Sequence, residues 1–227
     1  ATTEIYTLSL HDALPICSIL FMHTTLIAVT TLDGRIGPGL VGSAADRAHL
    51  EAARMRTDAS LIGAGTLRAG QVEMRGTGGI IPPDRIRAVI TGSGSLPLDD
   101  RKLFQEGPPP VVFTAERHAA SLQAAAGDRA RVEGLNAGTD GLSVRSALAR
   151  LAAMGASSVL IEGGARLNHA ALAEGAVDEM LLTLAPRIGG RRGDPALADG
   201  DGPLGAPWLD LVLVEHRAED TGELFLR

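Results

Sequence analysis

The sequence predicts a single α/β domain built on a mostly parallel sheet. Short apolar runs rich in β-branched residues alternate with alanine-rich segments of helical spacing. Continuous apolar strands of this kind are typical of a sheet that helices cover on both faces. The last two apolar runs, 208–218 and 223–227, are joined by a short turn with no helix between them. They predict an antiparallel pair at the end of the sheet.

The expected elements follow in strand–helix order. Strands are expected over 24–34, 59–65, 86–95, 109–116, 131–135, 157–164 and 178–186. Helices are expected over 44–56, 117–127, 144–155 and 165–175. Ser43 and Ser143 stand where a side chain can cap a first helical turn, and Gly127 stands where a helix can end. In the first helix, the residues expected to share one face are Ala45, His49, Ala52 and Met55.

Composition excludes several classes of function. The chain has 227 residues, a net charge of −6 and one cysteine. An acidic chain is a poor binder of nucleic acid, and a single cysteine excludes a disulfide framework or a CxxC zinc site. No apolar run reaches the roughly 20 residues of a membrane span. Metalloprotease, serine-hydrolase and P-loop motifs are missing. We therefore expect a cytoplasmic protein that binds a small molecule, without metal, nucleic acid or membrane.

Residues 1–17 differ from the rest. The stretch 1–16 has neither helical nor alternating spacing, and it resembles the in-frame translation of a common short-read sequencing adapter. A signal peptide is the alternative, but the basic n-region and the A-x-A site are lacking. We expect a non-native leader over 1–17, a start at Met22 and one domain over 22–227.

Glycine-rich turns after strands indicate a nucleotide site. Glu162-Gly163-Gly164 lies between an expected strand and an expected helix. Glycines there let backbone N–H groups approach a ligand, and a helix start favours a pyrophosphate. A plain tight turn explains the same residues. The segment 63–70 is not a full G-x-G-x-x-G fingerprint, but Thr66 could serve a phosphate or nicotinamide loop. The polar turn 91–95 would line the same sheet edge.

Three charged residues could act on a substrate. Asp33, in the turn after the first strand, could orient a polar ring or deliver a proton. Arg54 and Arg75 could hold a substrate phosphate by paired hydrogen bonds. A solvated turn or helix face is the alternative for each of them.

Together, the segments 30–37, 53–70, 161–186 and 188–190 resemble the C-terminal reductase domain of the riboflavin-biosynthesis deaminase–reductases. The resemblance covers essentially all of 22–227, and IEGG-x-x-LN (161–168) is its most specific piece. It implies a three-layer dihydrofolate-reductase-like fold with a mostly parallel central sheet and antiparallel C-terminal strands. It also implies a homodimer and NADPH as hydride donor. No His-x-Glu or Pro-Cys-x-x-Cys zinc site of the deaminase half is present, so a stand-alone reductase is expected.

The implied reaction reduces C1′ of a ring-opened ribosylaminopyrimidine 5′-phosphate, as in 5-amino-6-(5-phosphoribosylamino)uracil reductase. The resemblance places Arg54 and Glu162 at the substrate, with Met74 and Arg75 near it. The proton could come from water or from a polar group such as Asp33, the candidate catalytic residue. The resemblance places at the cofactor Val29, Thr66, Ser93, Gly163, Gly164, Ala165, Arg166, Leu167 and Asn168.

The chain departs from the family pattern near the substrate. Gly70-Gln71 replaces an acidic pair, Pro38 replaces a serine, and Leu40 stands where tryptophan is common. Two alternatives therefore stay open. One is an NADPH-dependent reductase of a pterin or another small imine or carbonyl compound. The other is a nucleotide-binding protein without catalysis.

Overall fold

The computed structural model describes residues 22–37, 39–138, 141–206 and 208–227. The expected leader over 1–17 and the departure at Pro38 lie outside them. No helix in these ranges is long and apolar enough to cross a membrane.

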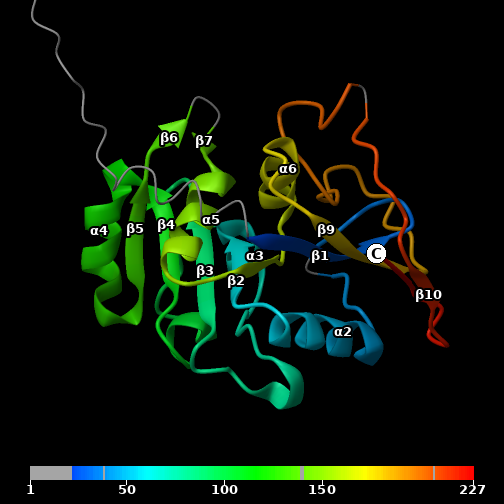
Figure 1. Cartoon of the computed structure of the whole chain (residues 1–227), viewed down its shortest axis with the longest axis horizontal. Coiled ribbons are helices and arrows are strands. Elements are labelled where there is room, and N and C mark those ends of the chain that lie inside the picture. Colours follow the sequence, from blue (N-terminus) through cyan, green and yellow to red (C-terminus); the bar gives the residue numbers. More distant parts are fainter. Residues whose placement is uncertain (1–21, 38, 139–140, 207) are drawn as a thin grey trace, which may run out of the picture.

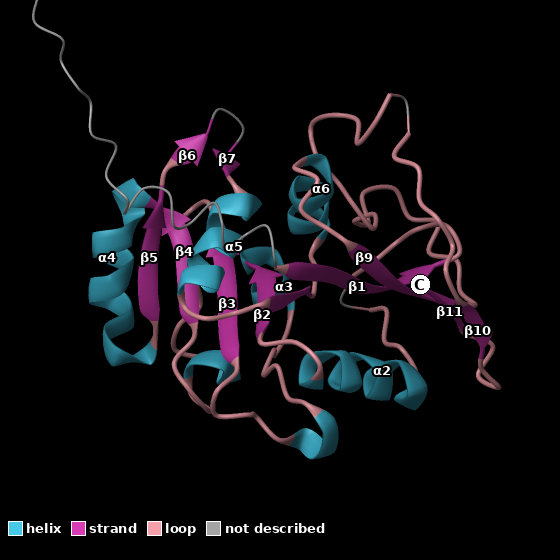
Figure 2. Ribbon diagram, viewed as in Figure 1, coloured by secondary structure: helices cyan, strands magenta, loops and turns pink. Residues whose placement is uncertain are grey.

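A nine-stranded sheet forms the centre of the protein (Figures 1 and 2). In spatial order its strands are β10 (His216–Ala218), β11 (Leu224–Leu226), β9 (Glu179–Ala185), β1 (His23–Thr31), β8 (Ser158–Ile161), β2 (Ala59–Gly63), β3 (Ile86–Thr91), β4 (Val111–Ala115) and β5 (Arg131–Leu135). From β9 to β5 every pair is parallel. The pairs β9–β11 and β11–β10 are antiparallel. The predicted mixed sheet is confirmed.

Helices cover both faces, which makes three layers. The helices are α2 (Ala44–Met55), α3 (Ala64–Ala69), α4 (Glu116–Ala126), α5 (Val144–Ala153) and α6 (Ala165–Ala173). Side chains of α5 and α6 pack in one core cluster, and those of α3 and α4 pack in another. Because strand side chains alternate, Leu61 belongs to the first cluster and its neighbour Ile62 to the second. Helix α2 lies on the same face of the sheet as α3 and α4, where Ala53 packs against Ile27 and Leu160.

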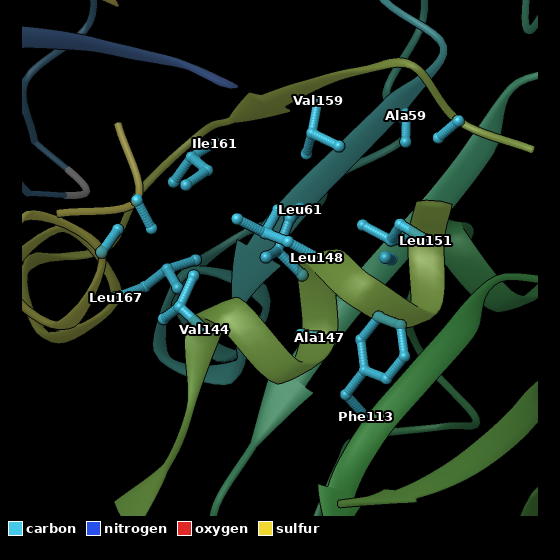
Figure 3. Packing of buried hydrophobic residues seen from close by; sticks show 14 of the residues in the cluster. Ala59, Leu61, Phe113, Val144, Ala147, Leu148, Leu151, Val159, Ile161 and Leu167 are labelled. Atoms are coloured by element: carbon cyan, nitrogen blue, oxygen red, sulfur yellow. The ribbon is translucent and has the colours of Figure 1, made fainter. Parts of the chain in front are cut away.

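Figure 3 shows the first cluster from close by. Leu148 and Leu151 of α5 approach Leu61 of β2 and Phe113 of β4. All four side chains are at most 3% exposed. This contact fixes α5 over the middle of the sheet, so the loops at the strand ends start from a rigid base.

Local helix signals are borne out. The Ser43 hydroxyl accepts hydrogen bonds from the backbone N–H groups of Ala45 and Asp46, and Ser143 accepts one from Ser146. Helix α4 ends at Gly127, whose φ is +57°, in the left-handed region that glycine adopts at little cost.

Three expectations need correction, and one hairpin was not predicted. The segment 63–70, expected as a loop, contains the short helix α3. The expected strand 208–218 is regular only over β10, and 208–215 is exposed chain without a strand. The hairpin β6 (Ala137–Gly138) with β7 (Gly141–Leu142) was not expected. Helix α2 is rotated, because Ala53 is its buried residue while Met55 is 52% exposed.

Candidate active site

A large cleft opens where the carboxyl ends of β2, β3 and β8 meet the middle of β1. Its volume is about 1030 Å³. Strand β8 lies between β1 and β2 in the sheet although it comes much later in the chain. The loops that follow β2 and β8 are therefore brought together. Open α/β sheets bind ligands in such a crevice beyond the strand ends.

The loop after β8 and the start of α6 form one wall of the cleft. Gly163 has φ +83° and its carbonyl accepts a hydrogen bond from the N–H of Gly63 (2.9 Å). The N–H of Gly164 donates to the Thr66 hydroxyl (2.9 Å). A Cβ added to Gly164 would lie 2.9 Å from that hydroxyl oxygen, so the turn is bound closely to α3.

The first turn of α6 faces the cleft. Residues 162–168 all line it, and the first intrahelical hydrogen bond runs from the N–H of Asn168 to the carbonyl of Gly164 (2.9 Å). The N–H groups of Ala165, Arg166 and Leu167 therefore have no partner within the helix. Together with the positive end of the helix dipole, they form a site suited to an anion.

A buried ion pair lies next to the start of α6, at Glu162. Arg54, on α2, donates from Nε and Nη2 to the two Glu162 carboxylate oxygens at 3.0 and 2.6 Å. The two side chains are 12% and 6% exposed. Burial raises the pKa of Glu162, but the charge and hydrogen bonds of Arg54, the Ser60 hydroxyl and the charge of Arg85 outweigh burial, so the pKa lies below its usual value. Glu162 is therefore ionised, and it lines the cleft.

Two arginines add positive charge to the cleft wall. Arg68 follows Thr66 on α3, and its guanidinium donates to the carbonyl of Ser95 (3.2 Å). The contact brings Arg68 beside the turn after β3, where Thr91 and Ser93 also line the cleft. Arg166 lies at the start of α6.

All nine residues expected at the cofactor lie together in the cleft lining. They are Val29, Thr66, Ser93, Gly163, Gly164, Ala165, Arg166, Leu167 and Asn168, and Glu162 of the expected substrate set accompanies them. Their roles towards a ligand remain predictions.

Met74, Arg75 and Arg54 are not among the lining residues. Met74 is fully buried in the second core cluster with φ +56°. The Arg75 guanidinium is bound to the carboxylates of Glu73 and Glu106 and to the carbonyl of Gly79 (2.7 Å). Arg54 reaches the cleft only through Glu162. Neither arginine presents an uncommitted guanidinium for a phosphate.

Asp33 also lies outside the cleft lining. Its carboxylate accepts hydrogen bonds from the Thr31 hydroxyl (2.6 Å) and from the N–H groups of Gly189 and Gly190 (both 2.9 Å). The Thr31 bond first, and then the two backbone bonds, hold the pKa of Asp33 well below its ordinary value. A carboxylate in this state ties two loops together and is a poor proton donor.

Sequence reasoning missed several residues of the cleft. Arg68 carries a signal in hindsight, since it follows Thr66 in the segment assigned to a phosphate loop. Others give no local signal, because Ile36, Leu142 and Pro195 reach the cleft from distant parts of the chain. Within the described residues, no group of three or more His, Cys, Asp and Glu side chains could hold a metal ion.

The sheet order, the three layers and this cleft define a dihydrofolate-reductase-like α/β protein. The chain belongs to the RibD C-terminal domain family, whose model matches residues 23–224.

Two kinds of relative resemble the chain in sequence. The 2,5-diamino-6-ribosylamino-4(3H)-pyrimidinone 5′-phosphate reductase of Methanothermobacter thermautotrophicus is 30% identical over 186 residues, which are 79% of this chain and 85% of that protein. The riboflavin biosynthesis protein RibD of Bacillus amyloliquefaciens is 27% identical over 188 residues, 79% of this chain and 50% of that protein. The chain thus spans about half of the RibD protein and most of the archaeal reductase.

Solved structures support the fold. A pyrimidine reductase-like protein from Corynebacterium diphtheriae superposes with a TM-score of 0.72 at 22% identity, covering 95% of this chain and 94% of that one. The riboflavin biosynthesis reductase Rib7 of Saccharomyces cerevisiae gives 0.66 at 17% identity, covering 96% and 95%. At these identities the likeness shows the fold alone.

Proposed function

We propose that the chain is an NADPH-dependent reductase of a ribosylaminopyrimidine 5′-phosphate in riboflavin biosynthesis. The observation that carries the proposal is the start of α6, whose first N–H groups have no partner within the helix and whose residues line the cleft beside Glu162. Family membership and the reductase names of the relatives support the same reaction class.

The cleft fits a reduced dinucleotide. A diphosphate would accept from the N–H groups of 165–167, and the close contact between Gly164 and Thr66 leaves backbone rather than side chain at this point. When bound, the nicotinamide supplies a hydride from its C4 carbon. The apolar residues Ile27, Ile36 and Leu40 would exclude water from the reacting carbon.

Preference for NADPH over NADH would depend on Arg68. Its guanidinium lies at the turn that carries Ser93, so a cation and a hydroxyl can both reach a 2′-phosphate there. Arg68→Ala should weaken NADPH binding by about tenfold or more and leave NADH binding nearly unchanged, because charge-assisted bonds to a phosphate are worth about 1.5–3 kcal/mol. Titration of nicotinamide fluorescence measures both. Equal losses for the two cofactors would contradict the assignment.

The reaction proposed for 5-amino-6-(5-phosphoribosylamino)uracil begins with the open-chain imine. Hydride adds to C1′, the C1′=N double bond becomes a single bond, and the nitrogen takes a proton. Because Asp33 is ionised and outside the cleft lining, we assign the proton to water. Alignment of the reacting carbons can lower the barrier by roughly 7–11 kcal/mol without an acid group.

A turnover assay tests the function. Protein begun at Met22 is mixed with NADPH and, separately, with the uracil compound, its 2,5-diaminopyrimidinone counterpart and a dihydropterin. We expect oxidation of NADPH with one or both ribosylaminopyrimidine phosphates. NADPH binding without turnover of any compound would indicate a nucleotide-binding protein without catalysis, and failure to bind NADPH would remove the enzyme proposal altogether.

One observation favours a second candidate, a reductase of an uncharged pterin, imine or carbonyl compound. Arg54 and Arg75, the expected phosphate ligands, are committed to carboxylates and backbone carbonyls. Oxidation of NADPH by the dihydropterin alone would select this candidate.

We further propose that the protein is a cytoplasmic homodimer. Trp208, Leu211, Val212, Leu213 and Val214 are 61–85% exposed along the chain that leads into β10, the edge strand of the sheet. An exposed apolar edge in a soluble protein is normally covered, and pairing with an identical edge covers both. Analytical ultracentrifugation should give a dimer, and Val212→Glu should give a monomer. A monomeric parent protein would contradict the assembly.

A further inference from the structure

Arg85 is a buried arginine that no step above uses. It precedes β3 and is 5% exposed. Its Nη1 donates to the carbonyls of Arg54 and Thr57, at the carboxyl end of α2. Its Nη2 donates to the Thr57 hydroxyl (2.9 Å) and to the Ser60 hydroxyl (2.7 Å). The guanidinium thus joins the end of α2 to β2.

The Ser60 hydroxyl connects Arg85 to the cleft. A guanidinium only donates hydrogen bonds, so the Ser60 oxygen must accept from Arg85. The single Ser60 proton is then directed to its other partner, which is Oε1 of Glu162. Ser60 is fully buried, so water does not compete for this hydroxyl. The Ser60 hydroxyl therefore accepts from Arg85 and donates to Glu162, and so links the guanidinium to the carboxylate.

The charges around Glu162 favour its ionised form, as the hydrogen bond from Ser60 does. Arg54 and Arg85 are the cations that influence its carboxyl. The acidic groups near these two arginines are Glu51, which acts on Arg54, and Asp58, which acts on Arg85. Asp58 is itself bound by the hydroxyl and N–H groups of Ser157 and Ser158. Glu51 and Asp58 thus act on the arginines, whereas the charges that act on the Glu162 carboxyl itself are those of Arg54 and Arg85, which disfavour its protonation.

We propose that Arg85 is a positioning residue for the cleft carboxylate: through Ser60 it orients Glu162 and keeps it in the ionised, acceptor-only form that a substrate N–H or O–H group requires. The proposal rests on the proposed function for the role of Glu162, but the Arg85–Ser60–Glu162 chain itself requires no substrate.

Arg87 provides a matched control. It lies on β3, is 1% exposed, and burial lowers its pKa to about 10, as it does for Arg85. Its guanidinium donates to the carbonyls of Pro108 and Glu73 and does not contact Ser60 or Glu162. Arg87→Met removes a buried guanidinium from the same part of the sheet and leaves the relay intact.

The first experiment follows kcat/KM against pH for the parent, Arg85→Met, Ser60→Ala, the double variant and Arg87→Met. Glu162 must lose its proton to act, so its ionisation sets the acid limb. We expect Arg85→Met and Ser60→Ala each to move this limb upward by about one pH unit. The double variant should move it little further, because both changes break one chain. Arg87→Met should lower the thermal midpoint without moving the limb.

Three results would overturn the proposal. The first is that Arg87→Met moves the acid limb of the kcat/KM profile as far as Arg85→Met does. The second is that the shifts of the two single variants add in the double variant, and the third is that neither Arg85→Met nor Ser60→Ala moves the limb. If Arg85→Met does not fold, Ser60→Ala carries the test, because it keeps the guanidinium and removes only the relay.

A second measurement separates this proposal from the proposed function. The unfolding midpoints of the parent and Glu162→Gln are compared from pH 7 to pH 3, in the presence and absence of the Ser60→Ala change. Because the folded-state pKa of Glu162 is lowered from 4.5, its stabilisation is full above that value and is lost as pH falls towards the folded pKa. With Ser60→Ala the loss should begin at the same pH, but it should be smaller and should be complete at a higher pH, because the folded-state pKa of Glu162 then lies nearer 4.5. No change refutes the relay, whereas absence of turnover in the parent with the expected pH shift refutes only the function.

Discussion

The contact between Gly164 and Thr66 leads to a sharp prediction for Gly164→Ala. The new Cβ would lie 2.9 Å from the Thr66 hydroxyl oxygen, where ordinary contacts begin at 3.4 Å. Thr66 is β-branched and sits on α3, so its side chain has few alternative positions. Moving it breaks the 2.9 Å hydrogen bond from the Gly164 N–H.

The expected cost follows from two effects. Overpacking of this kind costs about 1–3 kcal/mol, and loss of one hydrogen bond costs about 1 kcal/mol. A lower entropy of the unfolded chain offsets about 0.4–1 kcal/mol of this. We therefore expect Gly164→Ala to lower the free energy of unfolding by about 1–3 kcal/mol in urea denaturation. NADPH binding should weaken by about tenfold, because the first turn of α6 moves with Gly164.

Thr66→Ala supplies the decisive comparison. Alone it removes the acceptor for Gly164 and should cost about 1–2 kcal/mol. In the double variant the alanine at 164 no longer meets a hydroxyl, so the steric cost disappears. The double variant should be about as stable as Thr66→Ala, at least about 1 kcal/mol better than the sum of the two single losses. Strict additivity would refute the reasoning, since it would mean that the two residues do not touch.

Three further predictions concern the core, the cleft and the proton. Leu61→Ala, at a fully buried position of β2, should cost about 2–5 kcal/mol in urea unfolding. Gly65→Ala, on α3 with nothing within 4 Å of its new Cβ, should raise stability by about 0.4–1 kcal/mol and yet weaken NADPH binding, because Gly65 lines the cleft. Asp33→Asn should lower kcat by less than about tenfold, whereas loss of a general acid costs about 10²–10⁴. Since hydrogen bonds lower the Asp33 pKa from 3.8, its stabilisation is full above that value, and the thermal midpoints of variant and parent should converge as pH falls below it.

The fold was predictable where its signals are local. Ser43, Ser143 and Gly127 each act on the turn beside them, so the sequence shows the ends of their helices directly. Helix α3 was not predicted, because six residues are too few to show a helical period. The run 208–215 has the composition of a strand, but it pairs with no strand over most of its length. Composition alone does not show whether a partner strand lies beside it.

In the candidate site, too, residues with a local sequence signal could be predicted, and residues that depend on distant partners could not. The glycines after β8 point to the cleft because a ligand-binding turn and its glycines are adjacent in sequence. The partners of the arginines could not be predicted in this way, because a guanidinium pairs with whichever carboxylate the fold brings near it. Glu162 is 108 residues from Arg54, and Glu106 is 31 residues from Arg75. No pattern along the chain could identify these partners.

Although Arg54 is paired with Glu162, its charge still acts on a charged substrate. A buried ion pair is neutral overall, but here Arg85 adds a second cation to the pair of Arg54 and Glu162. Charge that is not balanced inside a protein acts over a longer distance than charge in water, because the interior screens it weakly. A phosphate in the cleft would therefore be attracted without touching Arg54 or Arg85, and its affinity should fall as salt rises. An uncharged pterin would bind with little dependence on salt. The salt dependence of KM thus distinguishes the two substrate classes by the same buried charge that orients Glu162.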